Sequence, residues 1–167
     1  MLRVEPTLYE SNAMKTAALR TVCALFLLSL LSACVNQQPT FTLVTFADGT
    51  RGLKTPVDTG APGPSQGDLF VFDQPLKNED GQDIGSNSGY CVTTLPGVHS
   101  QCQWTLIFSD AGKVTGTIVV GGQEHETGLS TVAILGSTGK YGDFTGHMTS
   151  EPMPDNTFKQ TLYLVPH

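Results

Sequence analysis

The chain has 167 residues, enough for one domain and a short flanking segment. Hydrophobic residues make up 39% of it and charged residues only 14%, while 18 glycines and 10 prolines favour frequent turns over long helices. The ordinary apolar content argues against a disordered chain. The net charge of −6 argues against a nucleic-acid-binding protein, so no nucleic-acid partner is expected.

The segment 1–33 has the features of a leader and lipoprotein signal peptide. Lys15 and Arg20 precede a short apolar run at 22–31, and small residues follow it at the expected cleavage point. The run is shorter than the roughly 20 apolar residues that cross a bilayer. We expect translation to start at Met14, because the residues before it add two acidic side chains where a signal peptide needs positive charge.

The end of this segment resembles the bacterial lipobox, with the sequence Leu31-Ser32-Ala33-Cys34. In that motif the cysteine is lipidated and becomes the mature N-terminus, and the alternative is an ordinary signal peptide followed by a chance cysteine. The pattern predicts an exported bacterial lipoprotein, held at a membrane by a lipid on Cys34. Val35 follows the cysteine instead of an aspartate, which by resemblance to enterobacterial sorting favours the outer membrane, on its periplasmic or surface face.

Beyond Gln38, apolar and polar residues alternate almost throughout, which predicts β-strands. Residues 47–66 are rich in Gly, Pro, Thr and Asp, so the segment 34–66 is expected to hold the lipidated cysteine, a first strand and a flexible linker, and 67–167 the barrel domain. The expected fold is an all-β, eight-stranded antiparallel up-and-down barrel, because closure removes exposed edges. A two-sheet sandwich is the alternative. The predicted strands cover residues 41–46, 68–73, 88–95, 102–108, 113–120, 129–135, 143–150 and 157–165.

Two cysteines flank a turn centred on Pro96 and Gly97. Pairing the residues outward from this turn places Cys91 directly opposite Cys102 on neighbouring antiparallel strands. Opposite Cα atoms in a sheet lie within disulfide range, and an exported protein meets an oxidising environment. We therefore predict a disulfide between these two residues.

The strand at 102–108 indicates which face of the barrel is buried. Its even-numbered residues are far more apolar than the odd-numbered ones, so they face inward, together with their partners across the hairpin. An eight-stranded barrel encloses either packed side chains or one small ligand. The candidate lining for a small hydrophobic molecule is Trp104, Leu106, Phe108, Thr93 and Leu95. A filled core without a pocket is the alternative.

Several short motifs occur in an order that resembles the allene oxide cyclase and dirigent protein superfamily. They are Gly67-Asp68-Leu69, Phe72-Asp73-Gln74-Pro75-Leu76, Gly89-Tyr90-Cys91-Val92, Trp104-Thr105-Leu106-Ile107-Phe108 and Leu135-Gly136-Ser137-Thr138-Gly139-Lys140-Tyr141. The resemblance covers residues 67–165. It implies an eight-stranded barrel with an apolar lumen, often trimeric, that steers the cyclisation or coupling of a bound hydrophobic molecule.

The resemblance also implies a catalytic candidate. Asp73 matches the first acidic position of a dirigent turn and would be the acid–base group of a cyclase or isomerase. The acidic residue that cyclases carry upstream and the arginines that dirigent proteins carry after the later turn are absent, so a non-catalytic binding or structural lipoprotein is the alternative. The segment Glu124-His125-Glu126 could hold a metal but is interpreted as a solvated loop, and neither a metal nor a cofactor is expected.

Overall fold

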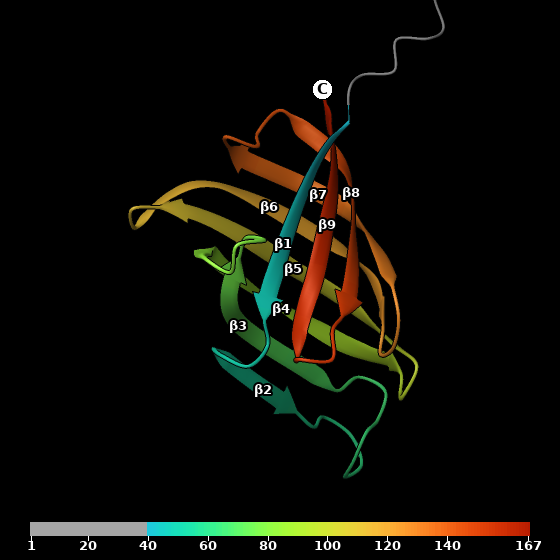
Figure 1. The fold of residues 1–167 in the computed structure, drawn as a ribbon. Coiled ribbons are helices and arrows are strands. Elements are labelled where there is room, and N and C mark those ends of the chain that lie inside the picture. Colours follow the sequence, from blue (N-terminus) through green and yellow to red (C-terminus); the bar gives the residue numbers. More distant parts are fainter. Residues whose placement is uncertain (1–39) are drawn as a thin grey trace, which may run out of the picture. The chain divides into compact units, whose positions relative to one another are not determined.

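The computed structural model describes residues 40–167, so the predicted signal peptide and the lipidation site at Cys34 lie outside the described residues. The described part of the chain is all-β, and none of its segments is a helix able to cross a membrane. Its nine strands (Figure 1) are β1 (Phe41–Asp48), β2 (Leu53–Val57), β3 (Leu69–Lys77), β4 (Asp83–Leu95), β5 (His99–Asp110), β6 (Lys113–His125), β7 (Ser130–Gly139), β8 (Phe144–Pro152) and β9 (Thr157–Pro166).

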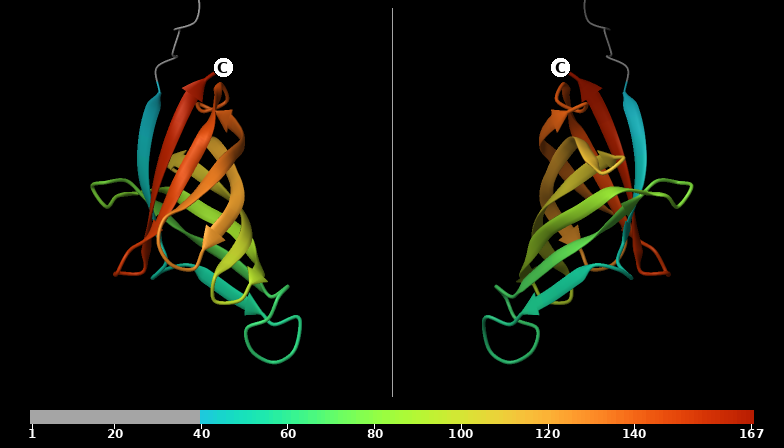
Figure 2. Two further views of the ribbon diagram at one scale, coloured as in Figure 1. Left: turned by 90° about the vertical axis from the view of Figure 1, so that its right-hand side faces the viewer. Right: turned by 90° about the vertical axis from the view of Figure 1, so that its left-hand side faces the viewer.

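Eight of these strands form a closed antiparallel barrel, which confirms the predicted fold. Consecutive strands from β3 to β9 pair with each other, β9 pairs with β1, and β1 returns to β3. The strands wind around a common axis in the two side views (Figure 2). The β1–β3 contact is short, joining Phe46 to Lys77 and Ala47 to Leu76, so the barrel closes along a narrow seam.

The segment expected as a flexible linker contains an additional strand, β2. This strand pairs with residues Leu69 to Asp73 of β3, on the same edge that β1 uses farther along. The reason is that β1 pairs only with Leu76 and Lys77, so this edge of β3 has no other partner over its first half, and unpaired strand edges are unfavourable. Because β2 contains polar residues and a proline, its sequence lacks the apolar alternation by which strands were predicted.

One half of the barrel interior is filled by side chains. Leu106 and Phe108 from β5 pack there with residues from β6, β8 and β9, and all are essentially inaccessible to solvent. The rings of Phe108 and Tyr141 lie 4.6 Å apart between centroids. This half of the interior is therefore a packed core, which supplies hydrophobic stability to the barrel.

A buried carboxylate stabilises the seam between β1 and β3. Asp48, at the end of β1, is 2% exposed and accepts hydrogen bonds from Lys77 Nζ at 2.7 Å and Arg51 Nε at 2.8 Å. Arg51 also pairs with the exposed Asp83 at 2.6 Å. The Lys77 ammonium, with Thr50 and Arg51, holds the pKa of Asp48 far below its usual range. This network ties the end of β1 to β3, directly before Gly49 at the edge of the cavity described next.

Candidate functional site

The other half of the barrel interior holds a cavity of about 280 Å³. It lies at the end where the β1–β2 and β8–β9 connections are found (Figure 1). Its size is close to the lower limit of small-molecule sites. The barrel therefore contains both a packed core and a pocket, stacked along its axis.

Aromatic side chains form much of the pocket wall. Trp104 from β5 and Phe72 from β3 are almost fully buried, and Phe158 from β9 is partly buried. Phe70 lies beside Phe72, with ring centroids 6.0 Å apart. Flat apolar walls of this kind favour an unsaturated or ring-containing ligand.

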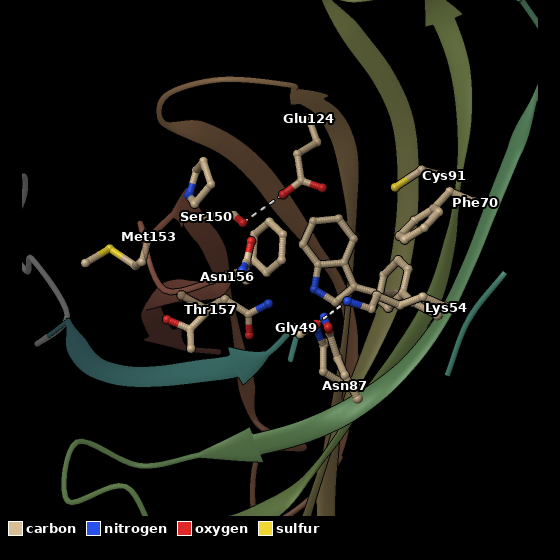
Figure 3. A pocket seen from close by; sticks show the side chains of 16 residues that line it. Gly49, Lys54, Phe70, Asn87, Cys91, Glu124, Ser150, Met153, Asn156 and Thr157 are labelled. Carbon is tan, nitrogen blue, oxygen red and sulfur yellow. Dashed lines mark hydrogen bonds between the residues drawn. The ribbon is translucent and has the colours of Figure 1, made fainter. Parts of the chain in front are cut away.

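Glu124 places a carboxyl group in this apolar wall (Figure 3). It accepts a hydrogen bond from Ser150 Oγ at 2.7 Å. Burial raises the pKa of Glu124, and the Ser150 hydrogen bond offsets only part of that rise. A carboxyl group held this way can donate or accept a proton closer to neutral pH than an exposed glutamate.

The interpretation of residues 124–126 as a solvated loop is therefore wrong for Glu124. Strand β6 continues to His125 because its pairing with β5 extends to the His99–His125 pair. Even-numbered residues of β6, including Ile118 and Val120, face inward, and Glu124 follows the same alternation. Extending this alternation beyond the apolar run was the sequence signal that could have identified it.

Two buried polar atoms near the pocket have no hydrogen-bond partner among residues 40–167. They are Asn87 Oδ1, an acceptor, and Trp104 Nε1, a donor. Buried polar groups are normally satisfied, so these two atoms, which belong to pocket-lining residues, are exceptions to that rule. Gln74, directly opposite Asn87 on the neighbouring strand, and Gln160 also line the pocket, and we call these three amide side chains its polar floor.

The predicted disulfide is present and forms part of the pocket wall. Cys91 and Cys102 are directly opposite each other on β4 and β5, with a Cα–Cα distance of 4.0 Å and an S–S bond of 2.06 Å. Cys91 lines the cavity, whereas Cys102 lies behind it with 2% exposure. Both sulfurs and one carboxylate oxygen of Glu124 lie within 4.8 Å of one another. Because the sulfurs are bonded to each other, they are not available as metal ligands.

Lys54 supplies a positive charge at the pocket. It lies on β2 opposite Phe72 and donates a hydrogen bond to the carbonyl oxygen of Gly49. Among the lining residues, Lys54 and Glu124 are the charged ones. The positive charge of Lys54 is exposed to solvent, whereas the carboxyl group of Glu124 is partly buried.

The sequence-predicted lumen residues occupy four different environments. Trp104 lies in the pocket wall, and Leu106 and Phe108 lie in the packed core. Thr93 is half-buried and lines a separate surface hollow near the β4–β5 turn. Leu95 is 48% exposed, which corrects its expected inward position: a β-bulge between Thr93 and Leu95 shifts the register at the strand end.

The structure places Asp73 on the outer face of β3. Its neighbours Phe72 and Gln74 are buried, and Asp73 between them is exposed and does not line the pocket. It therefore cannot act on a molecule bound there, and this corrects the expectation of a lumen acid. The run from Leu69 to Phe72 is apolar on both faces, so alternation could not show which face of β3 was inside.

The fold is shared with several solved proteins that act on small molecules. A pyocyanin demethylase matches with a TM-score of 0.60 and 26% identity, covering 76% of this chain and 100% of that chain. A pterocarpan synthase dirigent protein matches at TM-score 0.62 and 18% identity over 78% and 98% of the two chains. A Diels–Alderase from Streptomyces koyangensis matches with a TM-score of 0.59 and 19% identity, covering 99% of this chain and 84% of that chain. No protein-family model and no curated protein sequence matches.

These matches show the fold of the molecule. The chain has the barrel fold of dirigent proteins and of Diels–Alderase-type cyclases, as the resemblance noted from its motifs implies.

Proposed function

We propose that the pocket binds a small, largely apolar molecule and that the carboxyl group of Glu124 exchanges a proton with it, as in a cyclase or isomerase. The observation that carries this proposal is a partly buried carboxyl, its pKa raised by that burial, in the aromatic wall of a cavity of about 280 Å³. An acid of this kind in a small, largely apolar site is a common feature of acid–base catalysis.

The other pocket residues have clear tasks in such a reaction. Trp104 and Phe72 would hold an unsaturated molecule in one conformation, which lowers the entropic part of the barrier. Trp104 Nε1 would donate a hydrogen bond to the ligand and Asn87 Oδ1 would accept one, which fixes its orientation. The demethylase similarity, at 26% identity over that whole chain, supports an enzyme that acts on a ring-containing molecule.

Pyocyanin, which appears in the name of the similar demethylase, is the first molecule to test as a ligand. The intact protein is first examined by native mass spectrometry for a co-purified small molecule. Pyocyanin or the recovered compound is then incubated with the protein, and products are separated by chromatography and identified by absorbance and mass, because an isomer has the same mass as its substrate. Replacing Glu124→Gln should lower turnover by more than about 100-fold while changing ligand affinity little, because the amide keeps the shape but cannot transfer the proton. Glu126→Gln, an exposed neighbour, is the matched control.

Binding has its own test. Trp104→Phe keeps an aromatic ring but removes the indole donor, and it should weaken ligand affinity about tenfold if that donor meets the ligand. Turnover that survives Glu124→Gln, with binding intact, would refute acid–base catalysis by Glu124. Ligand binding without any turnover in the unaltered protein would correspond to the alternative of a non-catalytic lipoprotein.

We also propose that the protein is exported and anchored to a bacterial membrane through a lipid on Cys34. The lipobox-like sequence supports this, and a disulfide in the barrel is typical of proteins in oxidising compartments. Incorporation of labelled palmitate should be lost in Cys34→Ser, and its persistence would contradict the anchor. A homotrimer, implied by the superfamily resemblance, would show about three times the monomer mass by light scattering.

A further inference from the structure

We propose that the Cys91–Cys102 disulfide is a thiol–disulfide exchange site, in which a low-molecular-weight thiol enters through the pocket, attacks Cys91 and releases Cys102. This activity goes beyond the proposed conversion of an organic ligand and does not depend on it. It rests on the position of the disulfide in the pocket wall and on the carboxyl group beside it.

The two sulfurs differ in access. Cys91 is half-buried and lines the cavity, and its sulfur points into the pocket towards Glu124 (Figure 3). Cys102 is 2% exposed and is not among the lining residues. Exchange depends on which sulfur a nucleophile can reach, so attack falls on Cys91. The cavity of about 280 Å³ admits a small thiol but not the loop of a protein reductant.

Glu124 supplies the proton that the step requires. The incoming thiolate forms a bond to Cys91 Sγ, the S–S bond breaks, and its electron pair goes to Cys102 Sγ. A thiolate buried in apolar surroundings is unfavourable, so the leaving sulfur must gain a proton. One carboxyl oxygen of Glu124 lies within 4.8 Å of both sulfurs and can deliver it after a small rotation.

The products balance with two thiol molecules. The first leaves a mixed disulfide on Cys91 and a thiol on Cys102, and the proton lost by the entering thiol returns Glu124 to its acid form. The second thiol attacks the mixed disulfide, releases the small-molecule disulfide and leaves both cysteines reduced. The small thiol is oxidised and the protein disulfide is reduced by two electrons.

The experiment uses 2-mercaptoethanol and the folded full-length protein. The reaction is quenched with acid after short times, free thiols are alkylated, and fragmentation mass spectrometry locates each group. We expect the adduct on Cys91 and the alkylated thiol on Cys102, with a rate proportional to the thiol concentration. Near-UV circular dichroism confirms that the protein stays folded.

Two variants test the role of Glu124. Glu124→Gln should slow the exchange at least about tenfold, whereas Glu126→Gln should leave it unchanged. The rate per thiolate should also fall with rising pH in the unaltered protein, as Glu124 loses its proton, and stay flat in Glu124→Gln. An unchanged rate in Glu124→Gln would overturn the assignment of the proton donor.

The exchange site itself is tested on the unaltered protein, so a variant that fails to fold does not weaken the test. An adduct on Cys102 would overturn the proposal. A rate that stops rising with thiol concentration would also overturn the proposal, because unfolding of the protein would then be the rate-limiting step. Neither result bears on ligand binding in the pocket, so this proposal and the proposed function fail separately.

Discussion

Removing the charge of Asp48 should destabilise the barrel at its seam. Asp48 is 2% exposed and accepts hydrogen bonds from Lys77 and Arg51, which link the end of β1 to β3. The variant Asp48→Asn keeps the size of the side chain and one oxygen, which can still accept from the Thr50 N–H. It loses both ion pairs.

The expected cost is about 3 kcal/mol. Hydrogen bonds to charged groups contribute roughly 1.5–3 kcal/mol each, and two are lost here. The side chains of Arg51 and Lys77 are 46% and 28% exposed, so water can replace the carboxylate and the lower part of that range applies. For a domain of this size the loss corresponds to a fall of about 10 °C in Tm.

Guanidinium unfolding followed by fluorescence measures this cost, because Trp104 is the single tryptophan and lies in the pocket wall. Asp83→Asn is the control, since Asp83 is exposed and pairs only with Arg51 in the described network. The pKa of Asp48 is lowered in the folded state, so its contribution exists above the unfolded pKa and declines as pH falls. The gap between the two proteins should therefore narrow below about pH 4. A loss under about 1 kcal/mol, equal to that of the control, would refute the reasoning.

Two further stability predictions concern the barrel interior. Burial raises the pKa of Glu124, so the folded state loses stability as pH rises from the pKa of the unfolded state to that of the folded state. The variant Glu124→Gln has no such loss, so its Tm should rise relative to that of the unaltered protein over this pH range. Below the range the Tm difference should stay nearly constant. A Tm difference independent of pH would contradict this. Leu106 has no exposed surface, so Leu106→Ala should lower the free energy of unfolding by about 3 kcal/mol in denaturant titrations. A loss below about 1 kcal/mol would show that the surrounding side chains move in to fill the space left by the leucine.

Features that depend on a few neighbouring residues could be predicted from the sequence. The turn at Pro96 and Gly97 fixes the pairing of the strands around it, so the Cys91–Cys102 disulfide followed from residue numbers alone. The inward position of Trp104 followed from strict alternation along one strand. Hairpin pairing and strand alternation are local geometry and need no knowledge of distant segments.

The pocket chemistry depended on segments far apart in the chain. Glu124 enters the wall because pairing with β5 carries β6 beyond its apolar run, and Ser150 reaches it from β8. Asn87 comes from β4 and Gln160 from β9, and nothing in their local sequence marks either as a floor residue. Polar residues at inward positions can be recognised as pocket residues only when the closed barrel shows that they lie at the same height along its axis.

The sequence by itself determined an all-β chain, its hairpin disulfide and the aromatic strand that faces inward. Only the tertiary structure decided that β3 turns Asp73 outward, that β2 completes the edge beside the short seam, and that a cavity remains above the packed core. The physical reason is that barrel closure sets the register of every strand at once. A strand that is apolar on both faces, or polar at an inward position, has no preferred orientation until its neighbours are in place.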